Sequence, residues 1–262
     1  MQVAVKDKVI VMTGGTKGVA KGVAIEAAKQ GADIVISGRD AAGAEPVLAA
    51  IREAGRRGIF VPIDLHNAAD CEKLFAEAMK EFGKVDGFLN YAGVTPAAPL
   101  TEETPEQFDE VMAINIRAAF FCAQNAIRCM RQNENGGSIV MIGSPHAWVG
   151  EKDRTAYSVS KGALLTLTEH IAHHYAMDKI RANFVTLGWT PTEGELALRE
   201  QQGMTPDELR EWAAGFIPLG RMPEVEDQVP GILYLLSDDS RMTVGANLRM
   251  TGGMYFENAT IS

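Results

Sequence analysis

Hydrophobic positions along the chain form short apolar runs that alternate with longer amphipathic stretches. The runs are four to seven residues long, and several are rich in valine and isoleucine. Such runs are typical of strands in a parallel sheet, where helices cover both faces. The predicted strands are residues 9–12, 33–37, 58–63, 85–90, 138–143, 181–187 and 247–251.

Between these runs the apolar residues recur at helical spacing. The clearest predicted helices are residues 19–30, 68–82, 105–132 and 155–176, with Thr155 as the expected N-cap of the last. Regular alternation of strand and helix predicts an α/β fold with a doubly wound parallel sheet in three layers, α/β/α. The chain shows no linker, repeat or low-complexity segment, so we predict one domain over residues 1–262.

One stretch interrupts the alternation. Residues 188–220 contain no apolar run of strand type and follow directly after the predicted strand at 181–187. Ligands of open α/β sheets bind beside strand ends, and long connections there often act as lids. We therefore expect a substrate loop or lid at about 188–220, although a helical excursion without function remains the alternative.

Composition narrows the class of protein. The formal charge of −9 and the pI of about 5.1 argue against nucleic acid as a partner. No apolar run approaches the roughly 20 residues of a membrane span, and we expect no secretory signal at the start of the chain. Three cysteines without a CxxC or Cys/His cluster predict buried thiols, no structural metal and a reducing, cytoplasmic compartment.

A glycine-rich turn, TGGTKGVA at residues 13–20, joins the first predicted strand to the first helix. Gly14 would allow the sharp turn, and Gly18 would let the backbone approach a pyrophosphate at the helix N-terminus. Ala20 stands where a third glycine is commoner, and its methyl group should be tolerated at a helix–strand contact. This position in the chain favours dinucleotide binding over an ordinary turn.

The end of the second predicted strand suggests which dinucleotide is bound. An Asp or Glu would hold a ribose 2′-hydroxyl, but the strand ends in Ser37, Gly38 and Arg39. A guanidinium can bind a 2′-phosphate, with Lys17 adding charge from the glycine turn. We therefore predict NADP(H) over NAD(H). Asp40 could instead pair with Arg39 or face the ribose, and Arg39 could be a solvated loop residue.

Three polar residues lie between positions 144 and 161. Tyr157 and Lys161 are four residues apart and share one face of the predicted helix, while Ser144 ends a strand. A cation beside a phenol lowers its pKa, so Tyr157 could exchange a proton with a carbonyl or an alcohol. The Ser144 hydroxyl could hold the same oxygen. Taken alone, a Tyr and a Lys at this spacing would be read as ordinary helix residues.

Together these features resemble the short-chain dehydrogenase/reductase family, in its compact branch of about this length. The resemblance covers the whole chain and rests on residues 13–20, Asp64, residues 90–93, Asn115, Ser144, Tyr157, Lys161 and residues 251–253. It implies a Rossmann fold and an NAD(P)-dependent alcohol dehydrogenase or ketone reductase. Ala20, Tyr91 and Leu187 depart from the commonest family pattern without removing a group that the mechanism needs.

The resemblance also implies roles for individual residues. Tyr157 would be the acid/base, and Lys161 would lower its pKa and hold the nicotinamide ribose. Ser144 would orient the substrate carbonyl, and Asn115 would support a proton-relaying water, unless it marks a structural kink. Asp64 would contact the adenine, unless it only forms a turn. The implied cofactor-binding residues are Gly14, Thr16, Lys17, Gly18, Val19, Arg39, Asp64, Leu65, Asn90, Ala92, Gly93, Tyr157, Lys161, Gly188, Thr190 and Thr192.

The candidate substrate contacts are His146, Trp148, Trp189 and Glu193, and Glu151 and Arg154 are further candidates. Indole rings beside polar groups suit a small polar alcohol or ketone, such as a sugar or polyol. Each tryptophan could equally pack beneath the lid. The alternatives are reduction of another ketone, such as a 3-oxoacyl thioester, and a non-catalytic NADP-binding sensor.

The resemblance further implies a homotetramer or homodimer. Family members usually pair their long fourth and fifth helices and their C-terminal strands. Residues 120–127 and 247–256 are apolar enough for such contacts, although burial within one subunit would explain them equally.

Overall fold

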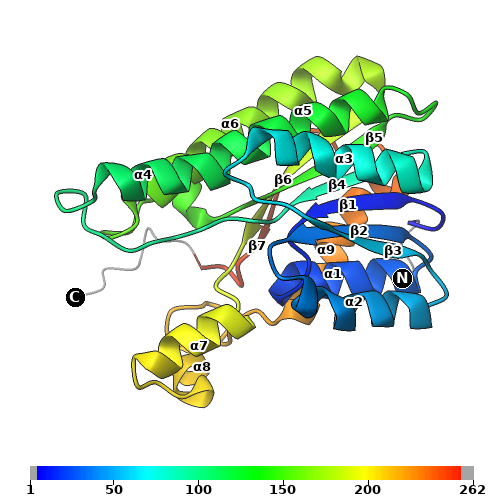
Figure 1. Ribbon diagram of the computed structural model, residues 1–262. Helices are drawn as coiled ribbons and strands as arrows, with labels where there is room; N and C mark the ends of the chain where they lie inside the picture. Colours follow the sequence, from blue (N-terminus) through cyan, green and yellow to red (C-terminus); the bar gives the residue numbers. More distant parts are fainter. Residues whose placement is uncertain (1–4, 255–262) are drawn as a thin grey trace.

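The computed structural model describes residues 5–254 and contains one seven-stranded parallel sheet (Figure 1). The strand order is β3-β2-β1-β4-β5-β6-β7, the doubly wound arrangement expected from the sequence. The strands are β1 (Val9–Thr13), β2 (Asp33–Gly38), β3 (Gly58–Pro62), β4 (Gly87–Asn90), β5 (Gly137–Gly143), β6 (Ile180–Leu187) and β7 (Asn247–Met250). The order reverses between β1 and β4, so a crevice for a ligand is expected at their carboxyl ends.

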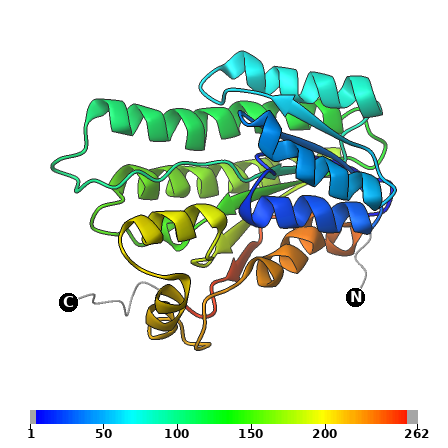
Figure 2. The ribbon, with the colours of Figure 1, turned by 60° about the horizontal axis from the view of Figure 1, so that its bottom comes forward.

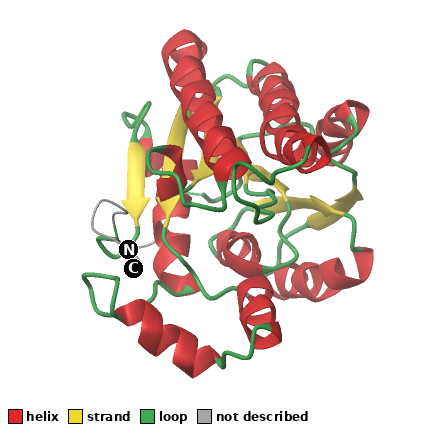
Figure 3. Ribbon diagram, turned by 90° about the vertical axis from the view of Figure 1, so that its left-hand side faces the viewer, coloured by secondary structure: helices red, strands yellow, loops and turns green. Residues whose placement is uncertain are grey.

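Helices cover both faces of the sheet and form the outer two layers (Figures 1 and 3). On one face lie α1 (Gly18–Lys29), α2 (Ala41–Glu53) and α9 (Val225–Leu236). On the other lie α3 (Ala68–Phe82), α5 (Ala119–Met130) and α6 (Thr155–Tyr175). Each face has its own large apolar core, which explains why all five residues of β1 are buried.

The predicted helix at 105–132 is interrupted by a change in winding. It consists of α4 (Pro105–Met112), a π-helical segment (Ala113–Ala118) and α5, which begins at the next residue. A π segment accommodates extra backbone in a helix and frequently occurs at functional sites. Asn115 lies within it, which places this side chain at the carboxyl end of the sheet.

Residues 188–220 contain two short helices and no strand, as predicted. The helices α7 (Glu193–Gln201) and α8 (Pro206–Ala214) lie outside the two main layers (Figures 1 and 2). They pack around a third apolar cluster, separate from the other two, in which Leu209, Ala213, Ile217 and Met222 are buried. We call residues 188–220 the lid.

The remaining described helices are short 3-10 turns: Pro145–Ala147, Ala176–Asp178 and Asp238–Ser240. Cys71, Cys122 and Cys129 are free and buried, as predicted. Within residues 5–254, every helix is too short or too polar to cross a membrane.

Candidate active site

The glycine turn between β1 and α1 depends on backbone conformations that favour glycine. Gly14, Gly15 and Gly18 have φ angles of 90°, 114° and 57°. A Cβ atom on Gly15 would lie only 2.5 Å from Cγ2 of Ile36, so this glycine, absent from the predicted set, has no substitute. Ala20 is fully buried, so the fold accommodates its methyl group.

An anion already lies on the first turn of α1. The Gly18 N–H donates a hydrogen bond of 2.8 Å to Oε2 of Glu193, and Lys21 Nζ lies 3.5 Å from Oε1. Desolvation raises the pKa of Glu193, but hydrogen bonds from its own amide and from Gly18, with the charge of Lys21, outweigh it and lower the pKa overall. The structure thus places Glu193 at the glycine turn, residues 13–20, rather than among the predicted substrate contacts. We call this segment the phosphate turn below.

This carboxylate tests whether the turn fits a dinucleotide. A helix N-terminus that accepts a carboxylate can accept a phosphate, because both present anionic oxygen to the same N–H groups. Lys17 is exposed at the N-cap position and leaves these amides without a side-chain cap of its own. The residues present therefore fit the pyrophosphate of a nicotinamide dinucleotide.

Tyr91, where the family more often has asparagine, also reaches this turn. Its side chain is half-buried, and desolvation raises the pKa of its hydroxyl, while the nearby backbone of Val19 opposes this shift. The sequence indicated that this departure removes no essential group. The structure shows that it adds a hydroxyl oxygen beside Gly18.

Arg39, after β2, is exposed. Its neighbour Asp40 neither pairs with it nor faces a ribose, the two roles considered from the sequence. Asp40 accepts a 2.9 Å hydrogen bond from the Gly43 N–H and so caps α2. Hydrogen bonds with His66 lower the pKa of Asp64, and the charge of Arg39 adds a smaller effect in the same direction. Arg39 therefore remains available to an anionic group near the adenosine.

Asp64 forms the turn that the sequence suggested as an alternative role. Its Oδ1 accepts hydrogen bonds from the backbone N–H of His66 at 3.0 Å and lies 2.7 Å from the ring nitrogen Nδ1. The other ring nitrogen lies 2.5 Å from Glu110. Hydrogen bonds to Glu110 and Asp64 raise the pKa of His66, so this histidine bridges two carboxylates. Leu65 is half-buried beside them.

The floor of the crevice is organised by Thr13, which the sequence analysis did not select. Its hydroxyl donates to Oδ1 of Asn90 at 3.3 Å and accepts from the N–H groups of Tyr91 at 3.1 Å and Ala92 at 3.3 Å. In the sequence, only its position at the end of the first predicted strand indicates that Thr13 could belong to the site. These contacts hold residues 90–92 at the mouth of the crevice.

Asn115 is fixed by three hydrogen bonds. Its Nδ2 donates to the Val94 carbonyl at 2.9 Å and to Ser160 Oγ at 3.0 Å, and its Oδ1 accepts from the Val94 N–H at 2.8 Å. A Cβ on Gly93 would lie 3.1 Å from Oδ1 of Asn115 and 3.8 Å from Nζ of Lys161. The π segment supplies Asn115 and α6 supplies Lys161, and the two side chains meet at the same glycine.

Tyr157 and Lys161 lie on one face of α6, as predicted. This helix begins at Thr155, with Arg154 in the N-cap position, so Thr155 is not the N-cap that the sequence suggested. The Lys161 nitrogen lies 5.5 Å from the Tyr157 ring centroid and donates a 2.8 Å hydrogen bond to the Ile142 carbonyl. Ser144 is hydrogen-bonded to the Tyr157 side chain.

The ionisation of this pair differs from the sequence expectation. Burial raises the pKa of Tyr157, and the hydrogen bond from Ser144 opposes this only in part, so the pKa is not lowered as predicted. Burial also lowers the pKa of Lys161 to about 8. The Tyr157 phenol is therefore protonated at neutral pH and can donate its proton. The Lys161 side chain is still mostly charged at pH 7, but it loses its proton about one pH unit higher.

The candidate substrate residues lie in different places. The His146 and Tyr157 rings meet edge to face at 5.5 Å, and burial, reinforced by Arg154, lowers the pKa of His146 to about 4. Trp148 is half-exposed, and its ring contacts are with Phe184 and Arg249. The structure therefore brings the neutral His146 ring to Tyr157.

Trp189 belongs to the lid. Its indole N–H donates to Glu195 at 2.9 Å, the Arg199 guanidinium lies 5.1 Å from its ring, and Trp212 packs edge to face at 5.4 Å. The packing alternative raised for this tryptophan matches these contacts.

The three predicted cofactor residues at the start of the lid lie between β6 and α1. Gly188 has no room for a side chain, because a Cβ would lie 2.8 Å from Cα of Thr251. Thr190 is buried and accepts a hydrogen bond from Gln228 at 3.4 Å. Thr192 lies against Gly18. The first residues of the lid therefore contact the phosphate turn through Thr192.

Comparison with known proteins agrees with this geometry. A family model described as enoyl-(acyl carrier protein) reductase matches residues 14–255. The chain is 33% identical to an L-rhamnose 1-dehydrogenase (NAD(P)(+)) of Azotobacter vinelandii, covering 95% of this chain and 97% of that one. It is 31% identical to a 3beta-hydroxysteroid dehydrogenase of Mediterraneibacter gnavus, covering 94% of each.

Among solved structures, a short-chain dehydrogenase/reductase variant from Serratia marcescens superposes with a TM-score of 0.86 and 28% identity, covering 95% of this chain and 98% of that one. Fold, crevice and sequence relatives thus agree on an NAD(P)-dependent oxidoreductase that interconverts alcohols and ketones. The chain belongs to the short-chain dehydrogenase/reductase family.

Proposed function

We propose that this oxidoreductase uses NADP(H) to interconvert a small polar alcohol, of the sugar or polyol type, with its oxidised product. The product is a ketone, or a lactone where the oxidised group is the hemiacetal of a sugar. The observation that carries the proposal is the convergence of Ser144 and Lys161 on Tyr157, with Asn115 and Lys161 both next to Gly93. Bound in the crevice, the nicotinamide would supply or accept the hydride.

Tyr157 and Ser144 serve the substrate oxygen. In reduction, the protonated Tyr157 hydroxyl donates its proton as charge develops on the carbonyl oxygen. The Ser144 hydroxyl has one hydrogen, which acts on the Tyr157 oxygen in the cofactor-free protein and would turn to the substrate oxygen when substrate binds. In oxidation, the same phenol must first lose its proton, which its burial opposes.

Lys161 and Asn115 serve Tyr157. The Lys161 ammonium favours the phenolate that remains after proton donation, and it would hold the nicotinamide ribose. The pKa of about 8 means that this charge is lost as the pH rises through that value in the cofactor-free protein. Asn115 holds Val94 and Ser160, and a water on this side would carry protons between Lys161 and solvent.

Tyr157→Phe tests catalysis against the alternative of a non-catalytic sensor. The variant should lose about 10²–10⁴-fold in turnover, because the general acid is removed. It should bind NADPH as the parent does, since the phosphate turn is untouched. The assay is a panel of sugars, polyols and ketones with both cofactors. NADPH binding without turnover of any member by the parent enzyme would favour the sensor.

Arg39 supports the choice of NADP(H). Asp40 is engaged in capping α2, and the guanidinium is exposed beside Asp64. Replacing Arg39 with methionine should weaken NADPH binding about tenfold or more while changing NADH binding little, because only NADPH carries the 2′-phosphate. Arg52→Met, on the far end of α2, is the matched control. Equal losses for both cofactors would remove the basis for NADP(H).

The substrate class rests on the neutral polar His146 beside Tyr157 and on the likeness to L-rhamnose 1-dehydrogenases. The likeness to a hydroxysteroid dehydrogenase points to a larger, apolar ketone, and a 3-oxoacyl thioester remains the third candidate. Turnover of aldoses at higher kcat/KM than of a steroid or an acyl thioester is the expected result. The opposite ranking would replace the sugar with the better substrate.

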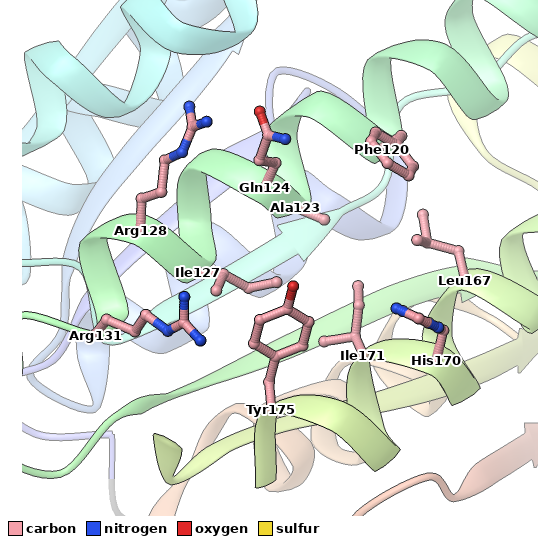
Figure 4. A pocket seen from close by; sticks show the side chains of 10 residues that line it. All are labelled: Phe120, Ala123, Gln124, Ile127, Arg128, Arg131, Leu167, His170, Ile171 and Tyr175. Atoms are coloured by element: carbon pink, nitrogen blue, oxygen red, sulfur yellow. The ribbon is translucent and has the colours of Figure 1, made fainter. Parts of the chain in front are cut away.

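We further propose a homotetramer or homodimer in a reducing, cytoplasmic compartment. A hollow of about 260 Å³ runs between the outer faces of α5 and α6 and includes Phe120, Ile127, Leu167 and Tyr175 (Figure 4). Phe120 is 47% exposed there, which suits contact with a second copy. Of the C-terminal stretch at 247–256, residues 255–256 lie outside the described residues. Measurement of the native mass tests this assembly.

A further inference from the structure

Glu193 is the first residue of α7, yet its carboxylate lies on another element. It accepts the Gly18 N–H at 2.8 Å and pairs with Lys21 at 3.5 Å, both at the start of α1. The Tyr91 hydroxyl also lies against Gly18, 3.2 Å from the position of a Cβ on that residue. An anionic oxygen of the chain itself therefore occupies the first N–H group of α1.

A dinucleotide that binds this turn needs the same groups. Its pyrophosphate would accept hydrogen bonds from the helix N-terminus, where the partial positive charge of the helix is greatest. The Gly18 N–H cannot serve the carboxylate and a phosphate at full strength together, and the two anions would repel each other. Cofactor binding must therefore remove Glu193 from Gly18.

The displaced residue belongs to a unit that can move as one. Trp189, Glu195 and Arg199 are joined by hydrogen bonds and ring contacts within the lid. The lid has its own apolar cluster, separate from the cores on either face of the sheet. Thr192, next to Glu193, also lies against Gly18, so the phosphate turn and the lid meet at this point.

We propose that Glu193 is a latch that holds the lid on the phosphate turn in the cofactor-free protein and competes with the incoming pyrophosphate. Arrival of the cofactor exchanges one anion for another and releases the start of α7 in the same event. The inference rests on the proposed cofactor site and deepens it, because it assigns a resting ligand to that site.

Glu193→Gln tests the latch, since glutamine keeps the shape and loses the charge. Affinity for NADPH and for inorganic pyrophosphate should rise about fivefold, as expected for removing one partly exposed charged competitor. Glu200→Gln, which removes an exposed carboxylate from the same helix, should leave both affinities unchanged. Calorimetry measures both ligands without requiring turnover.

Hydrogen exchange separates displacement from simple loss of repulsion. In the parent protein, inorganic pyrophosphate should slow exchange in residues 14–20 and accelerate it in residues 193–201. In Glu193→Gln, residues 193–201 should already exchange faster, and pyrophosphate should change only residues 14–20. The opposite responses of the two segments are specific to a latch.

Two results would overturn the latch while leaving the cofactor site intact. One is pyrophosphate binding that slows exchange in both segments of the parent protein. The other is equal affinity of Glu193→Gln and the parent. Absence of NADPH binding at any concentration would instead overturn the cofactor site and the latch together.

Discussion

Two regions meet at the carboxyl end of the sheet, and their attachment differs. The floor, formed by residues 90–94 with Asn115 and Lys161, is held by buried hydrogen bonds to backbone groups. The lid meets α1 through one half-exposed carboxylate and the contact of Thr192 with Gly18, and its own apolar cluster contains no residue of α1. The groups to which we assign chemistry are thus fixed by contacts within the fold, while the segment that we propose to be displaced by a ligand is attached by contacts that an anionic ligand can replace.

The largest effect should come from removing the floor's central amide. Asn115→Ala leaves both the N–H and the carbonyl of Val94 without this partner, and we expect the free energy of unfolding to fall by about 2–4 kcal/mol. Asn125→Ala is the control, because that side chain bonds only a carbonyl and an arginine within its own helix. Chemical denaturation measures both. A loss no larger than that of the control would mean that the floor does not depend on Asn115.

Lys161→Met should have a smaller effect of opposite sign. Burial lowers the lysine pKa from 10.5 to about 8, so the folded state at pH 7 carries an unfavourable buried charge. The variant should be more stable at pH 7 by about 2 kcal/mol, after allowing for the hydrogen bond lost at Ile142.

The pH dependence checks the cause of that gain. Between pH 8 and 10 the unfolded parent binds more protons than the folded one, so the parent's stability should rise with pH and the advantage of Lys161→Met should shrink. Lys29→Met, at an exposed position, should show no such trend. An advantage that stays constant from pH 7 to 10 would contradict burial as its origin.

The smallest effect should come from the lid. Trp189→Phe removes the hydrogen bond to Glu195 and weakens the contact with Arg199, but the lid cluster is separate from both main cores. We expect the global unfolding free energy to change by less than about 1 kcal/mol, while hydrogen exchange within residues 193–214 becomes faster. A large fall in global stability would show that lid and floor unfold together.

The sequence predicted the architecture well because periodicity reports burial directly. The predicted strands agree with the observed ones to within two residues, and the helix at 68–82 is reproduced at both ends. The glycine turn and the helical spacing of Tyr157 and Lys161 are likewise local patterns. Local patterns also explain why the lid region was recognised from its lack of a strand.

What escaped prediction depends on distant contacts. The placement of Glu193 requires knowing where the lid rests against α1, which no local pattern encodes. Burial in the folded protein raises the pKa of Tyr157, whereas the spacing of Tyr157 and Lys161 alone predicts that the lysine lowers it. The π segment at 113–118 was invisible because its apolar spacing also suits a regular helix.

That segment makes the active site depend on the number of residues in a helix as well as on their identity. A π segment holds about one extra residue because each of its residues turns less than in an α-helix, so deleting one residue from Ala113–Ala118 would let the backbone wind regularly with α4 and α5 nearly in place. Every side chain named as catalytic would still be present. Both flanking helices would keep their packing, but the residues of the segment itself, Asn115 among them, would take new positions around the helix, and Asn115 would lose its contacts with Val94 and Ser160. We therefore expect an engineered helix of ideal geometry here to give a poorer enzyme than the irregular one.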